Sequence, residues 1–244
     1  RLLRLIDEKG MLTEELKNDI MACNKLVDVE DLYRPYKEKK KTKATEAIAN
    51  GLEPLANLIM EFKNRNINEE AKTFLNEKVE TIEKAIEGAK YIIAEVISDN
   101  AEYRKYIREN IFKFGTLTSK LKKKSNELDI NKTYEMYYDF SESIKNIKPH
   151  RILAVNRGEK EGILSVNIEV DDSHILNYLE KKIIKNPNVV ESQIVKEAIL
   201  DSYKRLIFPS VEREIRSDLK VVAEEVAIDN FSKNVENLLL TPPI

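Results

Sequence analysis

The chain has 244 residues, of which 42% are hydrophobic and 34% charged, and its formal net charge is −2. This length supports one or two domains with a core, and the interspersed aliphatic residues exclude a disordered chain. The balanced charge excludes a polycation that binds nucleic acid over its whole surface. The single cysteine, Cys23, excludes an internal disulfide or a cysteine zinc cluster. No apolar run reaches the ~20 residues that span a bilayer.

Few helix-breaking residues interrupt the sequence, with only 6 glycines and 7 prolines, which predicts a mainly α chain. At the start, Thr13 is expected to cap a helix that ends near Cys23, and a second helix is expected from Asp28 to near Pro35. Residues 37–43 contain no apolar side chain and are expected to form a loop. Residues 1–45 are thus predicted to be the first part of a helical domain.

Short amphipathic segments with tight turns follow. Gly51 is expected to end one helix and Pro54 to begin the next. The clearest helical periodicity covers Val79 to Ile97, and Gly115 is expected to end the helix after it. Residues 46–115 are therefore predicted to form a helix-turn-helix-like bundle.

The third region, residues 116–244, is predicted to be the second part of the helical domain. It is expected to open with a basic connector and two short helices, at Leu117–Lys124, Tyr134–Phe140 and Ser143–Ile147. Pro149 suits the first position of a helix over residues 150–160, closed by Gly162. The alternative is a hairpin that pairs Ile152–Asn156 with Leu164–Ile168.

One alternating segment, Ile163 to Val170, predicts a strand, and its partner is expected in chain outside this sequence. The fold therefore has at most one short strand or hairpin. Two long helices are expected next, at Glu191–Ile207 and from Pro209 to about Leu239, the second about 45 Å long. This spine helix carries one apolar stripe: Val211, Ile215, Leu219, Val222, Val226, Phe231, Val235 and Leu238. Residues 241–244 are expected to begin a linker.

The most suggestive functional segment is basic and contains two tyrosines, Tyr33 and Tyr36. Lysine and arginine neutralise phosphates, and tyrosines stack on unpaired bases, so this segment is a candidate nucleic-acid contact. The alternative is a solvated loop whose tyrosines pack into the core. Its cations are Arg34, Lys37, Lys39, Lys40, Lys41 and Lys43.

Two further basic clusters are weaker candidates. One comprises Lys120, Lys122, Lys123 and Lys124 and has no aromatic residue. The other comprises Arg151, Arg157 and Lys160, whose alternative role is helix capping and salt bridging.

Catalytic signals are weak. The two histidines, His150 and His174, lack metal-binding spacing, and neither glycine-rich phosphate-binding motif occurs. We therefore expect no catalytic residue, no metal site and no cofactor.

Five runs, in order along almost the whole chain, resemble the Tex family of transcription accessory proteins. They begin at Asp31 (DLYRPYK, continued by KTKAT and GLEPLA), Gly88 (GAKYIIAE, then ISDNA), Pro149 (PHRILA, then RGE and EG), Tyr203 (YKRL, then PSVEREIR) and Leu238 (LLLTPP). The chain departs from the family pattern at Glu38 and Lys39, which weakens the basic segment, and at Lys148, where a small capping residue is common.

The resemblance implies a bacterial, cytoplasmic protein. It also implies a helical N-terminal and central region with a helix-turn-helix-like module, truncated here before a YqgF domain, helix-hairpin-helix repeats and an OB-fold RNA-binding domain. The expected function is a non-catalytic scaffold that contacts RNA or DNA, weakly without the missing domains, and positions those domains. The alternative is a platform for proteins of the transcription machinery without nucleic-acid contact; a hydrolase is the least supported hypothesis. No membrane association is expected.

Overall fold

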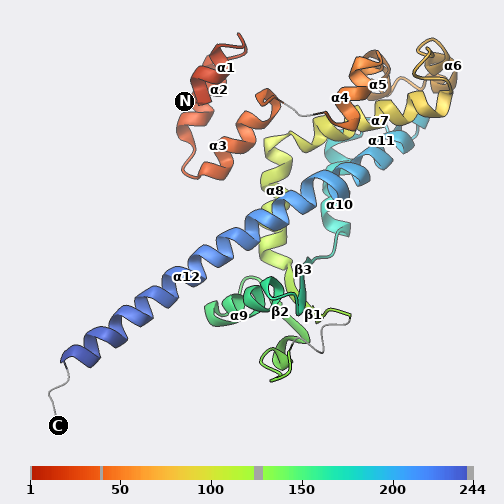
Figure 1. Cartoon of the computed structure of the whole chain (residues 1–244). Helices are drawn as coiled ribbons and strands as arrows, with labels where there is room; N and C mark the ends of the chain where they lie inside the picture. The colour runs from red at the N-terminus through yellow and green to blue at the C-terminus, as the bar shows by residue number, and fades with distance from the viewer. Residues whose placement is uncertain (1, 39–40, 124–128, 241–244) are drawn as a thin grey trace. The chain divides into compact units, whose positions relative to one another are not determined.

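A computed structural model describes residues 2–38, 41–123 and 129–240. It divides into two compact units, each made of two stretches of chain: Arg1–Ile107 with Ser173–Pro209, and Arg108–Asp172 with Ser210–Ile244. Most described residues are helical, and one small antiparallel sheet is added (Figure 1), which confirms the mainly α class. The helix-turn-helix-like bundle of residues 46–115 and its boundaries stay predictions.

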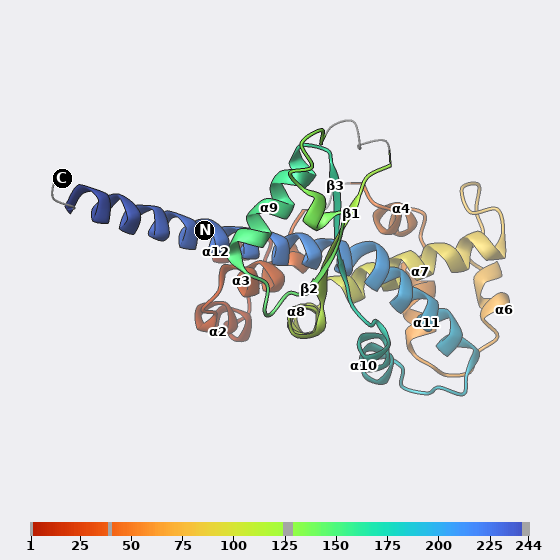
Figure 2. The same ribbon diagram turned by 90° about the horizontal axis from the view of Figure 1, so that it is seen from below.

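The first unit is helical in its described part. Helix α7 lies at its centre and packs against α4, α5 and α11; Figures 1 and 2 show α7 and α11 side by side. A Cβ atom on Gly88 of α7 would lie 2.3 Å from Cδ1 of Leu52, so this glycine permits the close approach. The elements are α1 (Leu2–Asp7), α2 (Glu14–Ala22), α3 (Leu26–Tyr33), the 3-10 turn η1 (Arg34–Tyr36), α4 (Lys43–Ala49), α5 (Glu53–Met60), α6 (Ile67–Lys72), α7 (Ile82–Ser98), most of α8 (Ala101–Phe114), α10 (Ser173–Ile183), α11 (Val190–Asp201) and the π-helical turn η3 (Ser202–Ile207).

Helix ends in this unit follow local capping chemistry. The Thr13 hydroxyl accepts a hydrogen bond from the Leu16 amide, as predicted for α2. Gly51 ends α4 with a φ of 83°, also as predicted. The predicted start of α3 at Asp28 was two residues late, and the predicted start of α7 at Val79 was three residues early.

The second unit contains a three-stranded sheet. Strands β1 (Thr116–Leu121), β2 (Asp139–Ser143) and β3 (Leu164–Glu169) lie in the order β2-β1-β3, with both pairs antiparallel. The 3-10 turn η2 (Glu135–Tyr137) precedes β2, and α9 (Pro149–Lys160) packs against β3 (Figure 2). A Cβ atom on Gly158 of α9 would lie 2.6 Å from Cδ1 of Leu164, so a glycine is needed at this contact.

Several predictions between residues 117 and 168 were wrong. The predicted basic connector Leu117–Lys124 is largely strand β1, in which Leu117 and Thr118 are buried between two neighbouring strands. The predicted helix Tyr134–Phe140 is instead the short turn η2 followed by the start of β2, and the predicted helix Ser143–Ile147 is the end of β2 and a turn. Helix α9 excludes the alternative hairpin, and β3 finds its partner within this chain rather than outside it.

The outer edge of β3 is covered by α12 (Phe208–Leu240). The Glu212 carboxylate accepts a hydrogen bond from the Ile168 amide at 2.8 Å. The Arg216 guanidinium donates to the Val166 carbonyl at 3.4 Å and pairs through both terminal nitrogens with Glu159 of α9. These side chains satisfy backbone groups that an uncovered edge strand exposes.

Residues 190–240 form one continuous helix, so the prediction of a long C-terminal helix is confirmed but the predicted break before Pro209 was wrong. Pro209 cannot donate to the Arg205 carbonyl, and its ring would clash with it in a regular α-helix. The π-helical turn just before Pro209 accommodates both effects. The predicted stripe is buried only at Val211 and Ile215; Val222, Val226, Phe231 and Leu238 are exposed. The predicted linker, residues 241–244, lies outside the described residues.

Candidate nucleic-acid interface

The basic segment joins α3 to α4 in the first unit. Tyr33 is the last residue of α3, Arg34 and Tyr36 lie in η1, Lys37 follows it, and Lys43 is the first residue of α4. A capping box between Thr42 and Thr45 fixes the start of α4, because each side chain accepts a hydrogen bond from the other residue's amide. Lys39 and Lys40 lie outside the described residues.

The described lysines in this segment are exposed, whereas its arginine and its two tyrosines are only partly so. Lys37, Lys41 and Lys43 are exposed, and Tyr33, Arg34 and Tyr36 are half-buried. The tyrosine rings therefore contact the protein and still present part of their surface to solvent.

A further cation, Lys9, belongs to the same surface. Its Nζ atom donates a 2.8 Å hydrogen bond to the backbone carbonyl of Tyr36, and the side chain is exposed. Sequence reasoning missed Lys9 because 27 residues separate it from Tyr36 and it has no basic neighbours in sequence. We call Lys9, Tyr33, Arg34, Tyr36, Lys37, Lys41 and Lys43 the basic surface.

The base of this surface is fixed by a buried ion pair. The Arg104 Nε atom of α8 lies 2.5 Å from Oδ1 of Asp31 in α3, and the two side chains are 0% and 5% exposed. Since Tyr33 follows Asp31 by two residues, this ion pair fixes the C-terminal end of α3, where Tyr33 lies.

The two weaker clusters lie in the second unit. Lys120 lies on β1, and Lys122 and Lys123 follow it, all exposed; the Lys122 amide donates to the Ile163 carbonyl at 2.9 Å. Lys124 lies outside the described residues. Arg151 pairs with Glu142 at 2.6 Å, which reduces the positive charge it presents, while Arg157 and Lys160 of α9 are exposed.

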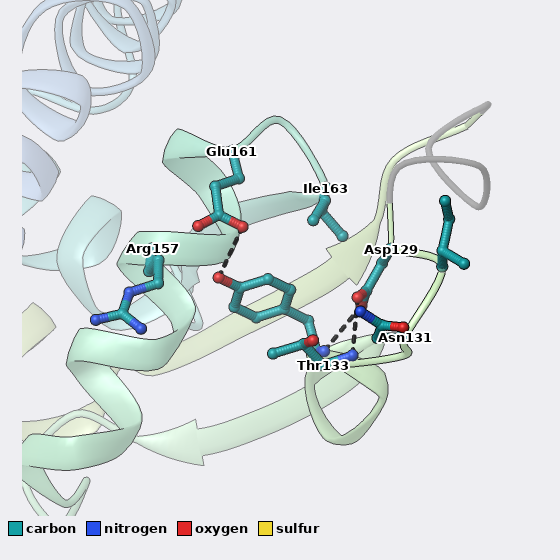
Figure 3. Close-up of a pocket in the computed structure, with 8 residues that line it drawn as sticks. Asp129, Asn131, Thr133, Arg157, Glu161 and Ile163 are labelled. Atoms are coloured by element: carbon teal, nitrogen blue, oxygen red, sulfur yellow. Dashed lines mark hydrogen bonds between the residues drawn. The ribbon is translucent and has the colours of Figure 1, made fainter.

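Arg157 also lines a polar cavity of about 400 Å³ in the second unit (Figure 3). On one side of it, the Asp129 carboxylate accepts hydrogen bonds from the amides of Thr133 and Tyr134, both at 2.8 Å, and from the Tyr138 hydroxyl at 2.9 Å. Burial alone would raise the pKa of Asp129, but these hydrogen bonds outweigh it and hold the pKa below its ordinary value.

On the other side of the cavity, the Tyr134 hydroxyl donates to Glu161 of α9 at 2.9 Å (Figure 3). Burial, followed by this contact with Glu161, raises the pKa of Tyr134. The side chains of Asp129 and Tyr134 thus form hydrogen bonds with other residues of the same unit. These contacts indicate a structural role, in which they hold residues 129–134 in place before η2.

An aromatic residue outside the predicted segment, Tyr91 of α7, lies among cations in the first unit. Lys43 Nζ donates to the Tyr91 hydroxyl at 3.1 Å and lies 4.5 Å from the ring centroid; the Arg205 guanidinium carbon of η3 lies 5.4 Å from the same centroid. The Tyr91 hydroxyl donates to Glu87. Tyr91 and Arg205 were not among the predicted site residues, although both occur in the runs that carry the family resemblance.

Metal-binding clusters and membrane-spanning helices are both missing from the part of the chain that the structure describes. There, no three or more His, Cys, Asp or Glu side chains gather in a way that could hold a metal ion. In the same part, none of the helices has both the length and the apolar character needed to cross a bilayer.

Comparisons with known proteins agree on one family. Residues 63–231 match the model described as Tex central region-like. The chain is 51% identical to the uncharacterized protein YdcI of Bacillus subtilis, over 100% of this chain and 34% of that protein. It is 31% identical to the transcriptional accessory protein Tex of Neisseria gonorrhoeae, over 99% of this chain and 32% of that protein, and 29% identical to the human S1 RNA-binding domain-containing protein 1, over 99% and 25%. The chain thus spans about a third of the length of the first relatives it matches, and it belongs to the Tex central region-like family.

Proposed function

We propose that this chain is a non-catalytic helical scaffold of a Tex-like transcription accessory protein. It contributes contacts to nucleic acid and positions further domains of the full-length protein. The observation that carries the proposal is the basic surface, in which Lys9, Lys37, Lys41 and Lys43 are exposed next to half-buried tyrosines. The names of two relatives, a transcriptional accessory protein and an S1 RNA-binding domain-containing protein, support the same class of partner.

Electrostatics at this surface favours a phosphate backbone. Each cation that neutralises a phosphate releases a condensed counterion, so affinity falls as salt rises, with a logarithmic slope of about −0.7 per contact for single strands. Half-buried tyrosines add stacking without sequence specificity, because every base has an aromatic face. We therefore expect the chain to bind single-stranded RNA or DNA weakly and with little sequence preference.

The test is a salt titration of binding to single- and double-stranded RNA and DNA, from about 50 mM upward. The variant Lys9→Glu/Lys37→Glu/Lys41→Glu should abolish measurable binding. The matched control is Lys78→Glu/Lys181→Glu/Lys185→Glu, which makes the same change in net charge at exposed lysines of the same unit. The control should bind as the unchanged chain does.

Two results would contradict the proposal. The unchanged chain would fail to bind any of the four nucleic acids at about 50 mM salt, or both triple variants would lose the same affinity. Metal-dependent cleavage that survives rigorous purification would contradict its non-catalytic part.

A second candidate, a platform for proteins of the transcription machinery, is favoured by one observation. The distal part of α12 exposes large apolar side chains, among them Ile228, Phe231 and Leu238 at 62%, 69% and 75%. Exposed apolar surface of this kind is common at protein interfaces. Its test is capture of purified bacterial RNA polymerase by the immobilised chain: Phe231→Ser/Leu238→Ser should abolish capture, and no capture by the unchanged chain would reject this candidate.

A further inference from the structure

Tyr91 gathers two cations that are far apart in sequence. Lys43 comes from the start of α4 and Arg205 from the π-helical turn η3, and both lie within 5.4 Å of the Tyr91 ring centroid. The two cations therefore cannot lie more than about 10 Å apart. Cation–π attraction and the hydrogen bond from Lys43 to the Tyr91 hydroxyl favour this arrangement.

Arg205 is oriented rather than fully neutralised. Its Nε and Nη2 atoms donate to the two oxygens of Asp201, at 2.8 and 2.5 Å, which raises the pKa of Arg205 and fixes the plane of the guanidinium. The pairing leaves the Nη1 edge of the fork outside the contact with Asp201, and the Arg205 side chain is 36% exposed. Such an edge can donate to a phosphate oxygen.

The π-helical turn is held firmly against α7. The buried Ser202 hydroxyl donates to the Ala94 carbonyl at 2.6 Å, one turn of helix beyond Tyr91. The next residue, Tyr203, is 1% exposed and packs edge-on against Phe208. Lys204 follows it on the outside, and its exposed side chain makes no hydrogen bond or ion pair with any other described residue. The turn thus presents Lys204 and Arg205 from a rigid base.

Acidic groups around Tyr91 are engaged by neighbouring side chains. Glu87 accepts from the Tyr91 hydroxyl, Asp201 from Arg205, and Glu95 from the Thr42 hydroxyl at 3.1 Å. These three carboxylates hold the hydroxyl and guanidinium groups that donate to them. None of them contacts Lys43 directly, and Lys43 has no carboxylate contact among the described residues. Since Lys43 is also the last residue of the basic surface, positive charge continues from the α3–α4 connection to η3 within one unit.

We infer that Lys43 and Arg205, which both face the Tyr91 ring, form with Lys204 of the same π-helical turn a clamp for the phosphates of single-stranded nucleic acid, which continues the basic surface. This inference rests on the proposed function and identifies where the strand continues. Tyr91 is a positioning residue in it, because its ring faces Lys43 and Arg205 and fixes the spacing of these two cations. The phosphate contacts come from the three cations.

The experiment measures the salt dependence of binding to a homopolymeric single-stranded RNA by the full chain. Lys204→Gln should reduce the slope of log affinity against log salt by about 0.7 and weaken binding about five-fold at 0.1 M salt. Lys204→Gln/Arg205→Gln should reduce the slope by about 1.4. Lys185→Gln, an exposed lysine of the same unit, is the control and should leave the slope unchanged.

Tyr91 is tested by two substitutions. Tyr91→Phe keeps the ring that faces both cations and should keep most of the slope, whereas Tyr91→Leu removes the ring and should lower the slope as the loss of one contact does. Thermal unfolding of each variant separates this effect from misfolding, since a purely structural role would lower the unfolding temperature without changing the slope of the folded protein.

The outcomes distinguish the two proposals. If the unchanged chain does not bind RNA, the proposed function fails. If it binds, and Lys9→Glu/Lys37→Glu/Lys41→Glu abolishes binding while Lys204→Gln/Arg205→Gln leaves affinity and slope unchanged, the clamp is wrong and the proposed function stands.

Discussion

Asp31 and Arg104 form a buried ion pair between α3 and α8, with 2.5 Å between Oδ1 and Nε. Both side chains are almost inaccessible, at 5% and 0%, so this contact stabilises two charges that burial would otherwise disfavour in the folded state. Asp31 lies in the run DLYRPYK, which is part of the family resemblance, and its contact indicates a structural reason for an acidic residue beside a basic segment.

Removing one partner of this pair should be costly. Asp31→Ala should lower the free energy of unfolding by about 3–5 kcal/mol, because it removes a buried carboxylate that faces the buried Arg104 charge at 2.5 Å. Denaturant unfolding measures this, with Arg4→Ala as the control. Arg4 pairs with Glu8 at the surface, with side-chain exposures of 83% and 54%, so its removal should cost less than about 1 kcal/mol. Equal costs for the two variants would contradict the assigned role.

Gly88 gives a prediction whose sign depends on packing. Alanine is favoured over glycine inside a helix by about 1 kcal/mol, but a Cβ atom here would lie 2.3 Å from Leu52 Cδ1, and Leu52 is only 2% exposed. Gly88→Ala should therefore destabilise the first unit by about 1–2 kcal/mol. In a Leu52→Ala background, the same substitution should become stabilising, because the obstructing atom is gone; a double-mutant cycle by urea unfolding checks this reversal.

Helices with strong local signals could be predicted from sequence. Thr13 caps α2, Gly51 ends α4, and Gly162 follows α9 with a φ of 79°, because capping and left-handed glycine positions depend on residues nearby in sequence. Strand β2 could not be predicted, since its sequence DFSES has no apolar alternation and its structure depends on pairing with β1. Pro209 predicted a break between two helices. The helix instead continues through the π-helical turn before Pro209, and no short sequence motif predicts such a turn.

The candidate site could be predicted only where it is continuous in sequence. The basic segment was found because its cations follow one another closely. Lys9 and the pairing of Lys43 with Tyr91 were missed, because tertiary packing brings together residues 27 and 48 positions apart. Such contacts arise only when the helices pack, as the packing of α4 against α7 shows for Lys43 and Tyr91.

Asp129 should make stability depend on pH in the acid range. Its pKa is lower in the folded protein than its ordinary value of 3.8, so its contribution is fully present above about pH 4 and is lost as pH falls through the folded pKa. The unchanged protein should lose stability in that range, and Asp129→Asn should lose less. Unfolding temperatures between pH 2 and pH 6 test this; parallel curves for the two proteins would assign the acid sensitivity to other carboxylates.

Glu212 allows a test of how the sheet edge is covered. Its carboxylate accepts from the Ile168 amide, and Ile168 is 3% exposed, so Glu212→Ala should leave that amide without its acceptor at a cost of about 1–3 kcal/mol. Glu212→Gln retains an oxygen acceptor and should keep most of the stability, which separates hydrogen bonding from charge. Asp218→Ala, an exposed site on the same helix, should change stability by less than about 0.5 kcal/mol. Hydrogen exchange of the Ile168 amide gives the local readout: it should accelerate in Glu212→Ala alone, and unchanged protection there would show that another group covers the edge of β3.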